Sequence, residues 1–240
     1  MADLIALHEA VRQCVDCELA QGRTFAVPGE GSPTADLMFV GEGPGYNEDR
    51  QGRPFVGAAG GFLNDLLASV GLRREDVFIT NMVKCRPPSN RDPFPGEIDA
   101  CAKYLDAQIE AIKPKVIVPL GRHALARWFP NESIGKLRGK PQQFGDITLF
   151  PLYHPAAALH NGGLRVTIEE DFAKLGELLR DARPAPAPMA QPEAIQADRV
   201  PAAEPMGSPV APALEQGPGQ EPEQQDSEGQ DGESQQLSMF

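Results

Sequence analysis

The chain has 240 residues, with 34 acidic and 22 basic side chains and a formal net charge of −12. Residues 182–240 hold 10 acidic and 2 basic residues, which leaves 24 acidic and 20 basic residues, or −4, in the first 181. The acidity therefore does not exclude a nucleic-acid partner for the front part. No apolar run approaches the ~20 residues of a membrane span and no signal peptide is evident, so we expect a cytoplasmic protein without a membrane partner.

Apolar runs alternate with turn signals through residues 1–181, which have the length of one domain with a full core. We expect helices over Leu4–Gln13, Gly61–Val70, Glu97–Ile112, Gly121–Trp128 and Ile168–Leu179. We expect strands over Leu37–Val40, Val77–Thr80, Val116–Leu120 and Ile147–Leu152. Strands separated by helices indicate right-handed crossovers. The sequence thus predicts an α/β fold, a three-layer α/β/α sandwich with a central four-stranded parallel sheet.

A glycine-rich turn, Gly41-Glu42-Gly43-Pro44-Gly45, follows the first expected strand. Glycines allow the backbone to turn sharply and to approach a ligand closely. The carboxylates of Glu42, Glu48 and Asp49 argue against a phosphate, and no Gly-Lys-Ser/Thr follows. We therefore expect the turn to accept a neutral, planar ligand.

Three chemically useful groups follow expected strands. Gly41-Glu42, Asn81 and His154 each stand at a strand's carboxyl end. Open parallel sheets bind ligands beyond these ends, so we expect these residues around one pocket. The alternative readings are structural: a cap for the asparagine and a strand-ending turn for the His-Pro pair.

The chain has four cysteines, Cys14, Cys17, Cys85 and Cys101, the first two in a C-x2-C pair. In a cytosolic protein these favour a metal over disulfides. The spacing leaves an iron–sulfur cluster, a structural zinc and unconnected buried thiols open, with metal favoured.

The last 59 residues differ in composition from the rest. Residues 182–234 are rich in Pro, Gln and Glu and cannot bury enough apolar surface to fold, so we expect a disordered linker. Residues 235–240 contain an apolar cluster that resembles the short peptide with which bacterial repair proteins bind the sliding clamp. The expected contacts are Gln236, Leu237, Met239 and Phe240.

Four motifs together resemble the type-4 uracil-DNA glycosylases, the iron–sulfur branch of their superfamily. They are the Gly41–Gly45 turn, Gly52-Arg53-Pro54-Phe55-Val56-Gly57, Thr80–Pro88 and His154-Pro155-Ala156-Ala157. The resemblance covers about residues 1–180. It implies a [4Fe-4S] cluster on Cys14, Cys17, Cys85 and Cys101 and removal of uracil from DNA by a monomer.

The resemblance also implies residue roles, with Gly41 and Gly43 against the base and Phe55 stacked on it. The Asn81 amide can accept from N3–H and donate to O4 of uracil, a pattern that cytosine reverses. His154 would stabilise the departing uracil anion. Glu42 is the first candidate to position water; Glu48 is the second, or excludes the thymine methyl.

Four basic residues, Lys84, Arg86, Arg91 and Arg165, are the expected contacts to DNA phosphates. Two other function classes stay open: a clamp-tethered damage-binding protein without catalysis, and an enzyme for another deaminated base or for free nucleotides.

Overall fold

Four parallel strands form the centre of the sheet, as predicted. The computed structural model describes residues 2–181, in which these strands are β2 (Leu37–Gly41), β3 (Phe78–Asn81), β4 (Val116–Pro119) and β6 (Ile147–Leu149). Every residue of β2, β3 and β4 is buried. Such continuous burial is typical of parallel strands that helices cover on both faces.

The sheet is mixed and has six strands in the order β1-β3-β2-β4-β6-β5, so a purely parallel, four-stranded sheet was wrong. β1 (Glu30–Gly31) pairs antiparallel with β3, and β5 (Gln142–Phe144) pairs antiparallel with β6. Both are short edge strands with no buried residue. They therefore carry no apolar run or alternation from which the sequence could predict them.

The expected helices are all present, with boundaries shifted by a few residues, and additional short ones occur. The helices are α1 (Ala2–Gln13), α2 (Leu19–Gly22), α3 (Tyr46–Gln51), α4 (Ala58–Ser69), α5 (Pro95–Ile112), α6 (Gly121–Ala126), α7 (Ile134–Leu137), α8 (Pro155–His160) and α9 (Gly163–Asp181). Two 3₁₀ turns are η1 (Arg74–Asp76) and η2 (Pro88–Asn90).

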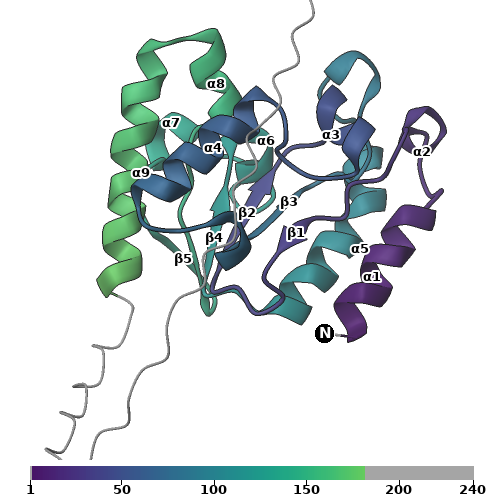
Figure 1. Cartoon of the computed structure of the whole chain (residues 1–240), viewed down its shortest axis with the longest axis horizontal. Coiled ribbons are helices and arrows are strands. Elements are labelled where there is room, and N and C mark those ends of the chain that lie inside the picture. Colours follow the sequence, from purple (N-terminus) through teal and green to yellow (C-terminus); the bar gives the residue numbers. More distant parts are fainter. Residues whose placement is uncertain (1, 182–240) are drawn as a thin grey trace, which may run out of the picture. The chain divides into compact units, whose positions relative to one another are not determined.

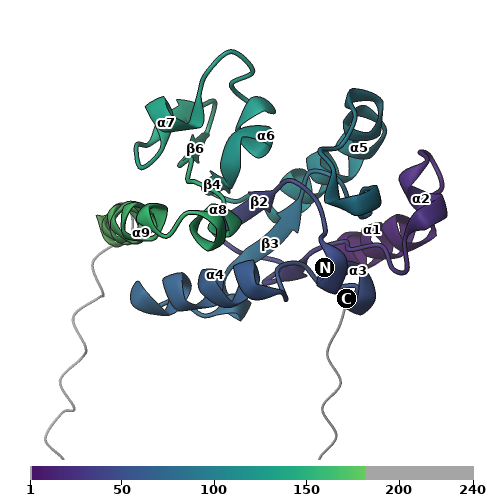
Figure 2. The ribbon, with the colours of Figure 1, turned by 90° about the horizontal axis from the view of Figure 1, so that it is seen from above.

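Helices cover both faces of the sheet, which confirms the three layers (Figure 1). On one face α4 and α9 pack on strand residues such as Phe39 and Val118. On the other, α1 and α5 pack on Met38, Phe78 and Ile117. Figure 2 shows α4 and α9 on the side of the sheet opposite to α5. Within residues 2–181 no helix combines the length and the apolar character that crossing a membrane requires.

The register of the parallel strands brings three loops to one edge. Gly41 pairs with Asn81 across β2 and β3. Leu120 and Leu152 form a parallel bridge beyond the ends of β4 and β6, and the Gly121 N–H donates to Leu152 O at 2.8 Å. The segments that follow these positions therefore meet above the same edge of the sheet.

Candidate active site

A cleft of about 780 Å³ lies at the carboxyl edge of the parallel strands. It is lined by six of the residues that the sequence predicted for the pocket: Glu42, Gly43, Glu48, Phe55, Asn81 and His154. Gly41 lies directly beneath, against Asn81 and Phe55. The predicted convergence of the three strand ends is therefore confirmed.

Asn81 ends β3 at the floor of the cleft, where its residue surface is only 2% exposed. Its side-chain Oδ1 is buried and has no hydrogen-bond partner. A buried acceptor without a partner costs about 1–3 kcal/mol. Such an atom at the floor of a cleft indicates that a ligand with an N–H or O–H group completes it.

Phe55 and Asn81 line the innermost part of the cleft, here called the slot, and both side chains pack against Gly41. A Cβ on Gly41 would stand 2.3 Å from Asn81 Oδ1 and 2.8 Å from Phe55 Cζ. Both distances are shorter than any real Cβ contact, so only glycine lets the Asn81 amide and the Phe55 ring lie where they do.

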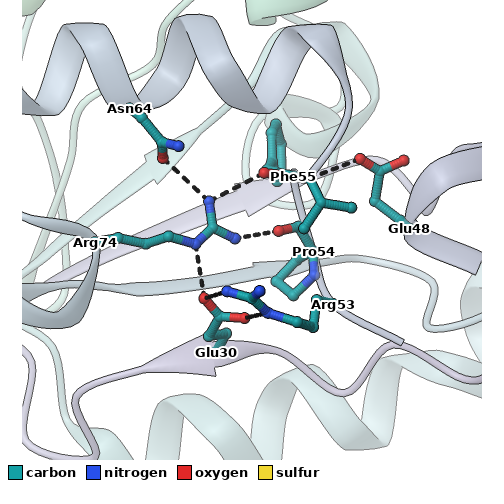
Figure 3. A network of polar contacts seen from close by, with 8 residues as sticks. Glu30, Glu48, Arg53, Pro54, Phe55, Asn64 and Arg74 are labelled. Carbon is teal, nitrogen blue, oxygen red and sulfur yellow. Dashed lines mark hydrogen bonds and ion pairs between the residues drawn. The ribbon is translucent and has the colours of Figure 1, made fainter. Parts of the chain in front are cut away.

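Phe55 adopts a positive φ of 51°, which is unusual for a bulky residue. Arg74 holds this conformation, because its guanidinium donates to the carbonyls of Phe55, at 3.1 Å, and of Pro54 (Figure 3). Glu30 accepts from both Arg74 and Arg53, at 2.7 and 2.6 Å. The two arginines hold the pKa of Glu30 below its usual range, against the effect of burial. The slot is therefore fixed by a charged network behind it.

Glu48 is engaged with backbone groups of the loops around this slot. Its carboxylate accepts from the N–H groups of Gly45, Val56 and Gly57 at 3.1, 2.8 and 2.9 Å. Figure 3 shows the Glu48 carboxylate directed toward the segment that carries Phe55. These bonds tie the glycine-rich turn to the segment that carries Phe55. They use the lone pairs that a water-positioning carboxylate would need.

His154 caps the short helix α8 and faces the cleft. Its Nδ1 accepts from the Ala156 N–H at 3.1 Å, so the proton of the neutral ring sits on Nε2. Burial lowers the pKa of His154 to about 4. The ring stacks on Phe55 with centroids 5.4 Å apart. His154 therefore offers a neutral N–H donor at neutral pH.

Glu42 faces the cleft with 31% of its side chain exposed. Its Oε2 lies 3.7 Å from His123 Nε2, and that nitrogen lies 3.2 Å from Asp92 Oδ2. Arg122 completes the group by donating to Asp92 at 2.8 Å. Asp92, Arg122 and His123 are not among the site residues predicted from the sequence. The signal for the last two was their place directly after β4, at the same carboxyl edge.

Lys84 does not face solvent, so its predicted contact with a DNA phosphate is wrong. The residue is 1% exposed. Its Nζ donates to Thr80 Oγ1, Asn81 O and Gln108 Oε1 at 2.6, 2.7 and 2.7 Å. Three oxygen acceptors compensate for much of the cost of burying the ammonium. Lys84 thus supports the backbone of Asn81 from within.

Each of the three predicted arginines has a partner inside the domain; Arg165 is exposed, and Arg86 and Arg91 are half-buried. Arg86 lies over the exposed Tyr46 ring, 5.1 Å from its centroid. Arg91 lines the cleft and pairs with Glu97 at 2.6 Å. Arg165 pairs with Glu169 at 2.9 Å, away from the residues that line the cleft.

The four cysteines line one small pocket, so they are not unconnected thiols. Cys14 and Cys17 follow α1, Cys85 follows β3, and Cys101 lies in α5. None is in a disulfide. Arg23 Nη1 lies 3.0 Å from Cys85 Sγ, and the Lys84 N–H donates to Cys101 Sγ at 3.3 Å. Four sulfurs in one pocket, two of them with N–H groups directed at them, fit a thiolate-bound metal centre.

Comparisons with known proteins agree with this site. Residues 28–181 match the Uracil DNA glycosylase superfamily. A type-4 uracil-DNA glycosylase of Sulfurisphaera tokodaii is 54% identical over 74% of this chain and 86% of its own. Those of Saccharolobus solfataricus and Archaeoglobus fulgidus are 53% and 46% identical over 74% and 77% of this chain, and over 86% and 97% of theirs. The chain belongs to the uracil-DNA glycosylase superfamily, and within it to the type-4 enzymes.

Proposed function

We propose that this chain hydrolyses the N-glycosidic bond of uracil in DNA and so starts base excision repair. The observation that carries the proposal is the orphaned Asn81 Oδ1 at the floor of the cleft, in a slot that it shares with the Phe55 ring. A base in a duplex reaches such a slot only after it is flipped out of the stack.

Base selection follows from the slot and its amide. Phe55 stacks on any base, a contact worth about 1–3 kcal/mol. Asn81 Oδ1 accepts from N3–H of uracil, and its Nδ2 donates to O4. Cytosine has an acceptor at N3 and a donor at N4, which would leave buried polar groups unpaired. This mismatch is the basis of selection against cytosine.

The departing base leaves as an anion with charge on its O2. We assign to His154 Nε2 the hydrogen bond that stabilises this charge more in the transition state than in the ground state. Two features support the assignment: Ala156 fixes the tautomer, and burial keeps the ring neutral.

Water attack on the sugar needs a carboxylate, and we assign this role to Glu42 rather than Glu48. Glu48 already accepts three backbone N–H groups, whereas Glu42 faces the cleft. A carboxylate there also stabilises the positive charge that develops on the sugar. Arg86 and Arg91 are the proposed phosphate contacts beside the cleft, with Arg165 farther out.

We propose a [4Fe-4S] cluster on Cys14, Cys17, Cys85 and Cys101. Zn–S bonds of about 2.3 Å in a tetrahedron would hold the sulfurs about 3.8 Å apart. In residues 2–181 no three of the four Sγ atoms lie within 4.8 Å of one another. This spacing supports a group larger than one ion. The cluster would tie the segment after α1 to the loop that follows Asn81.

Gly41→Ala tests the slot directly. The added methyl would collide with Asn81 Oδ1 and the Phe55 ring, at 2.3 and 2.8 Å, so we expect uracil release to fall ~10²-fold or more. Gly61→Ala, in α4 with no atom within 4 Å of the new Cβ, is the matched control and should keep wild-type activity. The measurement is free uracil released from single-stranded and duplex oligonucleotides.

The same assay separates the alternatives. Wild-type protein that binds uracil-containing DNA without releasing uracil would favour a damage-binding protein. Release of hypoxanthine in preference to uracil would favour another deaminated base. Equal activity of Gly41→Ala and Gly61→Ala would show that the base does not enter this slot.

We propose further that Gln236, Leu237, Met239 and Phe240 bind a bacterial sliding clamp, and that the protein acts as a cytoplasmic monomer. These four residues lie outside the residues that the structure describes. Support comes from the sequence, where three apolar side chains follow a polar, acidic stretch. A 53-residue linker with the reach of a flexible coil, ~40 Å, would let the domain search nearby DNA.

Replacing Leu237 and Phe240 with alanine should abolish binding to purified clamp in a surface-binding assay. Uracil release from short oligonucleotides without clamp should stay at the wild-type rate, because the cleft is untouched. Unchanged clamp binding by the double variant would refute the tether.

A further inference from the structure

One wall of the cleft carries two carboxylates with an imidazole between them. His123 Nε2 lies 3.2 Å from Asp92 Oδ2 and 3.7 Å from Glu42 Oε2. Arg122 reaches into the same group, donating from Nη2 to Asp92 Oδ2 at 2.8 Å and from Nε to His123 Nε2 at 2.9 Å. Two carboxylates, an imidazole and a guanidinium thus lie within a few ångströms of one another.

This group is assembled from three distant segments. Glu42 directly follows β2, and Asp92 lies in the loop between η2 and α5. His123 belongs to α6, which starts at Gly121, a glycine with a φ of 86°. The turn at Gly121 directs the helix toward the cleft, and all three side chains line it. Because Glu42, Asp92 and His123 come from separate segments, the fold and not nearness in the sequence brings them together.

We infer that His123 is a positioning residue that holds the Glu42 carboxylate in its ionised, water-orienting state, with Asp92 as the opposing charge. The inference rests on the proposed function, because it deepens the role assigned to Glu42. His123 touches neither the base nor the sugar in this proposal; it acts through Glu42.

The groups around Glu42 determine in which direction each substitution should move the pKa of Glu42. Burial raises the pKa of Glu42, His123 and Arg122 lower it, and Asp92 raises it. A carboxylate that must stay ionised in a half-buried wall therefore depends on the positive charge of Arg122 and, when it is protonated, of His123. Removing the imidazole should raise the pKa of Glu42, and removing the Asp92 charge should lower it.

The other charged groups at the cleft have partners of their own. Glu48 accepts three backbone N–H groups, and Arg91 is paired with Glu97. His154 is neutral, and Glu48 is the one charge that affects its pKa besides burial. A change at Asp92 should thus act on Glu42 and not on His154.

The test is the pH dependence of single-turnover uracil release for the full chain and its variants. In His123→Gln the acid limb of the profile should move to higher pH, and in Asp92→Asn it should move to lower pH, each by about 1 unit. The opposite directions are the signature, because general loss of structure would not produce them. Asp106→Asn, an exposed residue of α5 paired with Arg127, is the charge-matched control and should leave the limb in place.

The variant Glu42→Gln distinguishes a failure of the role inferred for His123 from a failure of the role proposed for Glu42. If Glu42→Gln is slow while His123→Gln and Asp92→Asn keep the wild-type limb, or move it in one common direction, the role of His123 is refuted and that of Glu42 stands. If Glu42→Gln has the wild-type rate and profile, the proposed role of Glu42 fails and the inference fails with it. Circular dichroism of each variant confirms that it is folded.

Discussion

Replacing His154 with alanine is expected to slow single-turnover uracil release by ~10²–10³-fold while DNA affinity stays nearly unchanged. The variant loses the Nε2–H donor that faces the cleft, and with it stabilisation of charge that exists only in the transition state. The measurement combines rapid-quench kinetics on a uracil oligonucleotide with equilibrium binding to the same strand.

A second variant and the pH dependence of the wild-type rate test the same role of His154. His154→Gln retains an N–H donor of similar reach and should recover part of the rate. Because burial lowers the pKa of His154 to about 4, the ring is neutral throughout the usual assay range. The wild-type rate should therefore not fall as the pH rises through 6.5. A rate that declines there, or full activity in His154→Ala, would remove the neutral donor from the mechanism.

Serine at Cys85 or Cys101 is expected to abolish iron binding and to lower the thermal stability of the domain markedly. The four cysteines join three segments of chain around one pocket, and a bound metal contributes its binding free energy to folding. Both residues are buried, at 6% and 8% exposure, so a vacated site would leave polar groups inside a small core. Iron and zinc analysis, absorbance near 400 nm and thermal melts measure the effect.

Ala102→Ser is the matched control, because it adds one hydroxyl to the same helix at a residue that does not line the cysteine pocket. It should keep its iron and its colour. Wild-type protein that is colourless, carries zinc and has full activity would contradict the iron–sulfur assignment.

Three of the four strands that the sequence predicted are buried along their whole length. β2, β3 and β4 are buried throughout and made mostly of apolar residues, so local composition was sufficient to place them to within one or two residues. β1 and β5 owe their conformation to pairing at the edges of a sheet that already exists. Such pairing leaves no periodic signal in Glu30–Gly31 or Gln142–Phe144.

The site residues likewise fall into those that the sequence could predict and those that it could not. Topology alone brought Glu42, Asn81 and His154 together, because parallel strands end at one edge. The prediction for Lys84 was wrong. Its sequence neighbours, a cysteine and an arginine, do not indicate that its ammonium donates to three oxygens inside the fold. His123 was not predicted, because the carboxylates beside its imidazole belong to residues in other segments, and the sequence around His123 does not contain them.

The charged network behind Phe55 bears on any attempt to redesign base preference. A positive φ at a phenylalanine costs about 1–3 kcal/mol, and Arg74 offsets it by binding the carbonyls of Pro54 and Phe55. The ring is thus anchored through its backbone, and changing the side chain alone would leave the loop in the same strained path. Protein engineers who want a wider slot would do better to vary the edge around Asn81 and to treat Glu30, Arg53 and Arg74 as fixed scaffold.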